Sequence, residues 1–204
     1  MKGLIQRFPY GAVLAFFLLL PVAAHALPVV FSAGGDNTAA SIQGAVDDFR
    51  AFVGDPNNGN APGPLPGGRR EINWDGGGAV TPTVSGTPFA GFLNNRGALF
   101  NTPGTGFIQA SPDDLALQFA NPTYSSTFSA FSPLRLFTPI DSNITDVTFF
   151  IPGTAGTVPA TVSGFGAIFT DVDILGSTLT GLDMPTVSEV QTIFVQAAGG
   201  QYRL

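Results

Sequence analysis

Glycine and proline interrupt this chain so often that only short secondary-structure elements fit between them. The sequence holds 26 glycines and 17 prolines, and both residue types weaken or end helices and strands. Short apolar runs recur between Gly, Pro, Asn and Ser positions, a pattern typical of an all-β domain. We expect strands at 27–33, 70–74, 98–100, 106–110, 115–119, 134–137, 146–151 and 158–171. The sequence therefore predicts an all-β fold, an antiparallel β-sandwich of jelly-roll or lectin-like type.

Two of these predicted strands show a clear alternation of side chains. In DVTFFI, Val147, Phe149 and Ile151 share one face. In GFGAIFT, Gly164 and Gly166 alternate with bulky side chains. A glycine within a strand often marks the close approach of another element, so we expect a neighbour to lie against this glycine face.

One segment breaks the β pattern. In SIQGAVDDFRAFV (41–53), apolar residues recur at spacings of 4, 3 and 4, at Ile42, Val46, Phe49 and Val53. This spacing predicts an amphipathic helix, which Ser41 is expected to cap and Gly54 to end. DPNNGNAPGPLPGG (55–68) follows as a loop with almost no hydrophobic anchor. We therefore expect a single N-terminal helix that packs on the sandwich.

The N-terminal stretch has the three parts of a secretory signal peptide. Lys2 and Arg7 give a basic start, residues 11–22 form an apolar run, and AHA at 24–26 is typical of a cleavage site. The apolar run is shorter than the ~20 residues of a spanning helix. We expect a signal peptide at 1–26, cleavage near Ala26–Leu27, a secreted or periplasmic protein, and no stable membrane insertion. Residues 27–204 suit one domain.

Residue types that are missing after position 26 exclude several chemistries. This part has no histidine, lysine or cysteine, which excludes Ser-His-Asp, Ser-Lys and cysteine nucleophiles and removes the usual ligands of zinc and copper. It holds six arginines against fourteen acidic residues, a balance that repels the phosphates of nucleic acids and lipids. We therefore expect no nucleic-acid partner and no enzymatic activity.

Oxygen ligands leave two other chemistries open. Calcium binds carboxylate, amide and carbonyl oxygens, and Asp171 with Asp173 can point to one face at the end of a predicted strand. The alternative for this pair is an Asx turn. A glycoside hydrolase needs only two acids at a defined separation, which Glu71 with Asp75, or the Asp171 pair, could supply. The alternative there is that these acids cap turns or bind arginines.

The most unusual stretch is GGRREINWDGGG (67–78), which holds two adjacent arginines and the only tryptophan. One interpretation is a glycan site with Trp74 as the stacking platform, whose candidate residues are Arg69, Arg70, Glu71, Trp74 and Asp75. The other is a structural clasp, in which Ile72 and Trp74 enter the core and Arg70 pairs with a carboxylate at its rim. A single tryptophan is more often part of a core, so we prefer the clasp.

Three stretches together carry a family resemblance: GRREINWDG (68–76), RGALFNTPGTGF (96–107) and GFGAIFTDVD (164–173). In combination they resemble a group of secreted, largely uncharacterised bacterial proteins of the PEP-CTERM-associated kind, here without the sorting tail that some of them carry. The resemblance spans residues 39–173. It implies an exported protein and carries over no activity. Such proteins continue with further strands and a DxxG turn, where this chain has GLDMPTVSEV (181–190), so we expect a truncation or a frameshift at the C-terminus.

These observations predict a secreted, non-enzymatic binding or extracellular-matrix module, stabilised by Ca²⁺ and recognising an extracellular glycan. The first alternative is a purely structural surface or biofilm protein. The second is a carboxylate-based glycan hydrolase.

Overall fold

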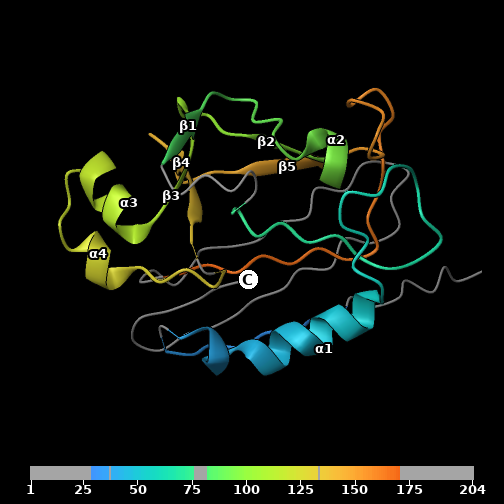
Figure 1. Cartoon of the computed structure of the whole chain (residues 1–204), viewed down its shortest axis with the longest axis horizontal. Helices are drawn as coiled ribbons and strands as arrows, with labels where there is room; N and C mark the ends of the chain where they lie inside the picture. Colours follow the sequence, from blue (N-terminus) through green and yellow to red (C-terminus); the bar gives the residue numbers. More distant parts are fainter. Residues whose placement is uncertain (1–28, 37, 76–81, 133, 171–204) are drawn as a thin grey trace, which may run out of the picture.

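The structure is a computed structural model, and it describes residues 29–36, 38–75, 82–132 and 134–170 (Figure 1). The predicted signal peptide and residues 171–204 lie outside the described residues. The described part contains a short 3-10 helix, four α-helices and five β-strands. In chain order they are the 3-10 helix (Ala39–Ser41), α1 (Gln43–Val53), β1 (Thr83–Ser85), α2 (Leu93–Arg96), β2 (Ala98–Asn101), β3 (Gly106–Ala110), α3 (Pro112–Gln118), α4 (Tyr124–Thr127), β4 (Leu136–Ile140) and β5 (Asp146–Phe149).

The strands form two small antiparallel sheets. One has the strand order β1-β3-β4, and the other pairs β2 with β5. In the first sheet Phe107 lies opposite Pro139, and in the second Phe100 lies opposite Val147. All five residues of β3 are buried, because this strand is paired on both edges and covered on both faces.

The domain therefore mixes helices and strands, and the expectation of an all-β fold is wrong, although the antiparallel pairing and the N-terminal helix are confirmed. Residues 115–118 of the strand predicted at 115–119 belong to α3, and Phe119 is its C-cap. The hydroxyl of Ser111 accepts a hydrogen bond from the backbone N–H of Asp114 at 3.2 Å, and Pro112 occupies the first turn. An N-cap serine, an early proline and acids in the first turn all favour a helix, and they override the apolar run that follows.

The other predicted strands have mixed outcomes. The strand predicted at 106–110 matches β3, and those at 98–100, 134–137 and 146–151 correspond to β2, β4 and β5 with shifted ends. In β5, Val147 and Phe149 are half-buried while their neighbours are exposed, which confirms the alternation. Residues 70–74 form no strand, and at their end Trp74 has a φ of 60°, in the left-handed region that strands do not use. The described parts of 27–33 and 158–171 contain no regular strand either.

Aromatic side chains fill the space between the two sheets. Phe107 of β3 and Phe137 of β4 stack at 4.8 Å between ring centroids, and Phe100 of β2 meets Phe137 edge-on at 5.3 Å. Phe149 of β5 packs against the same cluster. Each fully buried phenylalanine contributes about 1.5–3 kcal/mol through the hydrophobic effect. In a chain without cysteine, this cluster is a main source of stability.

The opposite face of the three-stranded sheet is covered by α3 and α4 (Figure 1). Ile108 and Ala110 point to this side because they alternate with Phe107 along β3. They form a second buried cluster with Leu115 of α3, against which Tyr124 of α4 packs. The short helices thus take the place that further strands would occupy in the predicted sandwich.

Helix α1 packs through the apolar stripe that its spacing predicts. Ile42 and Val46 are buried, and Gly54 ends the helix with a φ of 98°, as expected. Ser41 is not the N-cap: it belongs to the preceding 3-10 helix, and its hydroxyl donates to the carbonyl of Thr38 at 2.7 Å. The helix therefore begins two residues later than the sequence predicts.

An extended segment, residues 164–168, passes between α1 and β5 (Figure 1). The ring of Phe165 meets that of Phe149 on β5 at 5.6 Å between centroids. Ile168 packs on the other side, against the buried residues of α1. The segment therefore connects the helix layer to the sheet layer.

Gly164 and Gly166 make this contact with α1 possible. A Cβ atom at Gly164 would lie 2.9 Å from Cγ1 of Val53, and one at Gly166 would lie 2.9 Å from Cε1 of Phe49. Both distances are shorter than ordinary van der Waals contact. The expectation that another element lies against this glycine face is confirmed.

We expect Gly166→Ala to lower the free energy of unfolding by about 1–3 kcal/mol, because the added methyl group overpacks the contact with Phe49. Gly44→Ala is the matched control. Gly44 lies in α1 with open space around its Cα, so alanine should stabilise the protein by about 0.5–1 kcal/mol. Urea unfolding followed by tryptophan fluorescence measures both changes. Equal effects of the two substitutions would contradict the close contact.

Candidate functional site

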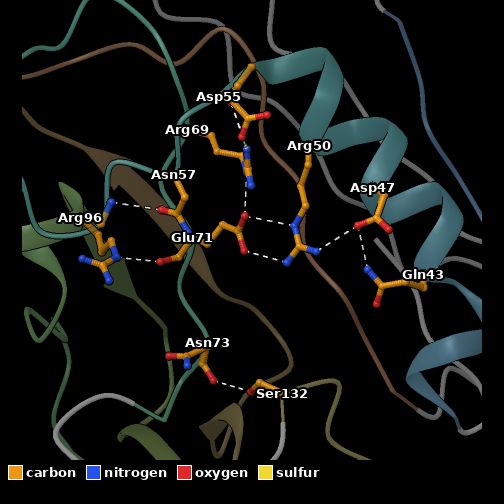
Figure 2. A network of polar contacts seen from close by, with 12 residues as sticks. Gln43, Asp47, Arg50, Asp55, Asn57, Arg69, Glu71, Asn73, Arg96 and Ser132 are labelled. Carbon is orange, nitrogen blue, oxygen red and sulfur yellow. Dashed lines mark hydrogen bonds and ion pairs between the residues drawn. The ribbon is translucent and has the colours of Figure 1, made fainter.

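Glu71 lies at the centre of a polar network that joins α1 to the arginine-rich stretch (Figure 2). Its carboxylate accepts hydrogen bonds from Nε of Arg50 at 3.1 Å and Nη2 of Arg50 at 2.7 Å. It also accepts one from Nε of Arg69 at 2.7 Å. Arg69 in turn pairs with the carboxylate of Asp55 and donates to the carbonyl of Gly54 at 3.2 Å. We call Arg50, Arg69 and Glu71 the Glu71 clasp.

The charges of the Glu71 clasp are partly shielded from water. The side chains of Arg69, Glu71 and Arg50 are 17%, 30% and 31% exposed. Burial by itself raises the pKa of Glu71, but the hydrogen bonds from both arginines outweigh it and bring the pKa below its ordinary value. The hydrogen bonds with Glu71 raise the pKa of each arginine. All three groups are therefore charged at neutral pH.

Arg70 and Arg96 anchor the loop at 55–68. Arg70 donates to the carbonyl of Gly59 at 3.0 Å and to that of Gly63 at 3.2 Å. Arg96, the last residue of α2, donates to the backbone carbonyl of Glu71 at 2.7 Å and contacts the side-chain oxygen of Asn60. The prediction that Arg70 pairs with a carboxylate is wrong within the described residues. Arginine side chains replace the hydrophobic anchor that the loop lacks.

Trp74 packs into the aromatic cluster between the sheets. Its ring stacks on Phe137 with 4.3 Å between centroids and 5° between planes, and it meets Phe92 and Phe100 edge-on at 5.6 and 5.5 Å. Its carbonyl accepts a hydrogen bond from the amide of Gln109 at 2.8 Å. Trp74 is half-buried. One face of the Trp74 ring is thus covered by Phe137, as expected from the interpretation that places Trp74 in the core.

Asp75 and Asn73 tie the same stretch to the segment before β4. A carboxylate oxygen of Asp75 accepts a hydrogen bond from the backbone N–H of Arg135 at 2.8 Å. The carbonyl of Asn73 accepts one from the hydroxyl of Ser132 at 2.5 Å. All five predicted site residues therefore make contacts within the chain, but these contacts reach different partners and do not converge on one pocket.

Two arginines of this network, Arg50 and Arg96, are absent from the sequence prediction. Arg50 follows Val46 by four positions, so it lies at the edge of the apolar stripe of α1. An arginine at that edge, in a chain with few cations, is a signal for a buried ion pair. Arg96 carries no comparable local signal, because its partners are a backbone carbonyl and an asparagine in a loop far away along the chain.

The predicted calcium ligands, Asp171 and Asp173, lie outside the described residues. Within the described ranges, no three side chains of the metal-binding acidic, histidine or cysteine types gather in one place. Asp36 accepts hydrogen bonds from the backbone and hydroxyl of Thr38, and Asn57 accepts one from Gly59. These side-chain oxygen atoms accept hydrogen bonds from residues two positions later and so stabilise local turns.

A shallow depression of about 520 Å³ lies between α3 and α4, and it shares no residue with the network around Glu71. Leu117 on its wall is 81% exposed.

Comparison of the chain with family models, with curated proteins and with solved structures gives no match. Among the helices in the described part of the chain, none has the length and apolar character needed to cross a membrane.

We expect Glu71→Gln to lower the free energy of unfolding by about 1–3 kcal/mol near neutral pH, because two half-buried guanidinium groups lose their anionic acceptor. The pKa of Glu71 is lowered in the folded protein, so its stabilisation is present above pH 4.5, the ordinary value, and is lost as the pH falls through the lower folded value. The difference between wild type and variant should therefore shrink below pH 4.5. Urea unfolding of both proteins at a series of pH values above and below 4.5 measures this difference in unfolding free energy.

Asp47→Asn is the control for this prediction. Asp47 pairs with the same Arg50 at 3.2 Å, but its side chain is 59% exposed. Exposed ion pairs contribute about 0.2–1 kcal/mol, so this variant should lose less than Glu71→Gln. A loss in Glu71→Gln that does not change with pH would contradict the charged clasp.

Proposed function

We propose that this protein is a secreted, non-enzymatic module that binds glycan or forms part of an extracellular matrix. The observation that carries the proposal is the environment of the Glu71 carboxylate. This carboxylate is bound by two arginines and its pKa is lowered. A glycosidase pairs a general acid of raised pKa with an ionised carboxylate. The lowered pKa does not suit Glu71 to the acid role, and its two arginine partners already occupy the carboxylate. This stretch therefore favours a scaffold over a catalytic site.

The glycan-hydrolase alternative loses support from Asp75 as well. One oxygen of Asp75 holds a backbone N–H at 2.8 Å, while Glu71 turns toward α1, so the two acids serve separate contacts. A hydrolase would then depend on Asp171 and Asp173, which lie outside the described residues.

A lectin-like β-sandwich belongs to the same proposal. Both antiparallel sheets contribute side chains to one aromatic cluster, and two sheets that share a core are the basis of sandwich architecture. The resemblance to exported proteins of the PEP-CTERM-associated kind, together with the signal-like N-terminus, supports an extracellular or periplasmic location.

The purely structural alternative gains support from Trp74, whose ring stacks within the core at 4.3 Å from Phe137. If glycan is bound, the described contacts favour a surface other than the exposed part of this ring. A binding role and a structural role are distinguished by whether isolated protein binds polysaccharide in solution.

We expect residues 27–204 to bind polysaccharide in a pull-down without releasing reducing sugars. Trp74→Leu should lower the free energy of unfolding by about 2–4 kcal/mol, because it removes core stacking, while the folded variant keeps its binding. Circular dichroism reports stability independently of the lost tryptophan. Loss of binding with unchanged stability would make Trp74 a sugar platform. Sugar release that Glu71→Gln abolishes would indicate a hydrolase.

Calcium stabilisation through Asp171 and Asp173 remains part of the proposal. A native-state ligand at 100 times its Kd adds about 2.7 kcal/mol, so calcium should raise the melting midpoint by several degrees and chelator should reverse the shift. Asp171→Asn should abolish the shift. Asp146→Asn, at an exposed acid on β5, is the control and should leave it unchanged. If calcium does not change the melting midpoint, Asp171 and Asp173 would be assigned to an Asx turn and not to a calcium site.

A further inference from the structure

Arg70 and Arg96 bring two guanidinium groups to one part of the loop at 55–68. Arg70 donates to the carbonyls of Gly59 and Gly63, and Arg96 contacts the side chain of Asn60. Both arginines are half-buried. Gly59 and Asn60 are neighbours in the chain, so the two guanidinium groups contact the same turn of the loop. Burial, and then the charge of Arg96, lower the pKa of Arg70.

Neither charge is balanced by a carboxylate in the described part of the chain. The ion pairs there involve Arg50 and Arg69. Glu71 turns its carboxylate to those two arginines and offers Arg96 only its backbone carbonyl (Figure 2). The remaining partners of Arg70 and Arg96 are neutral oxygens. This pair thus differs in kind from the neutralised arginines of the Glu71 clasp.

Donor groups of both arginines remain for a ligand. A guanidinium carries five N–H donors in a planar fork. Within the described residues, Nε of Arg70 and Nη2 of Arg96 make no hydrogen bond. A partly buried cation without a counter-ion is unfavourable, and a planar oxyanion satisfies both its charge and its donors.

We propose that Arg70 and Arg96 bind the carboxylate or sulfate groups of an acidic polysaccharide. This inference rests on the proposed glycan-binding function and specifies its ligand class. The rest of the protein does not attract polyanions, because acids outnumber arginines by more than two to one after position 26. Binding of an acidic polymer should therefore depend on these two side chains.

The test is isothermal titration of the signal-free protein with three polymers: polygalacturonate, dextran sulfate and neutral dextran. At least one acidic polymer should bind, and added salt should weaken the binding because it screens charge. Arg70→Gln and Arg96→Gln should each weaken it by about tenfold or more, the loss of a charged hydrogen bond. Binding of polygalacturonate would indicate recognition of carboxylate groups, and binding of dextran sulfate would indicate recognition of sulfate groups.

Two further variants keep the test decisive. Gln118→Glu, at an exposed position on α3, makes the same change in net charge and should alter the affinity by less than about twofold. If Arg96→Gln fails to fold, Arg70→Lys decides, because it keeps the charge but loses the planar fork and should still bind measurably more weakly.

Three results would overturn the inference. If Gln118→Glu weakens polymer binding as much as the arginine variants do, the loss of affinity is an effect of net charge and not of a site. Binding of neutral dextran that ignores both arginine variants would refute the acidic ligand and leave the glycan-binding function standing. Failure of all three polymers to bind would refute the site and favour the purely structural alternative.

Discussion

The carboxylate of Glu71 binds two arginines: Oε1 accepts hydrogen bonds from both Arg50 and Arg69, and Oε2 accepts one from Arg50. Arg50 connects α1 to this point, and Arg69 connects the start of the loop at 55–68 through its contacts with Gly54 and Asp55. Through the adjacent carbonyl, Arg96 adds α2. Because one small acceptor group serves these partners, the position of each limits the positions of the others. A half-buried carboxylate of this kind is costly to leave unpaired, so the network favours one arrangement of the helix, the loop and the sheets.

Apolar packing between the elements stabilises the fold together with this polar network. Helix α1 packs on the extended segment 164–168, and Phe165 of this segment meets Phe149 of β5. Phe149 also packs against the aromatic cluster that the two sheets share. Helices α3 and α4 cover the other face of the three-stranded sheet. Gly164 and Gly166 let α1 approach the segment, and the contact between Phe100 of β2 and Phe137 of β4 joins the two sheets. With no cysteine in the chain, close packing between these elements replaces disulfide bonds.

The arginines near residue 70 divide into two groups with different chemistry. Arg50 and Arg69 are neutralised by acids and hold the fold together. Arg70 and Arg96 bond only to neutral oxygens in the described part, which is the basis for the proposal that they bind an acidic ligand. One short charged stretch can thus combine a structural contact with a recognition surface. Glu71, one of the acids considered for a catalytic role, belongs to the structural group.

Local patterns in the sequence determined α1, β2, β3 and β5, the end of α1 at Gly54, and the glycine face against a neighbouring element. These features depend on spacing within a few residues. A local signal for α3 was also present in Ser111 and the residues after it. Only the tertiary structure decided the partners of Glu71 and Arg96 and the turn at Trp74, where a φ of 60° replaces the predicted strand. Apart from Arg69, which is two positions from Glu71, the groups that meet in these contacts are 21 to 36 positions apart. The physical reason is therefore that packing of the chain, and not a periodicity along the sequence, decides which of them meet.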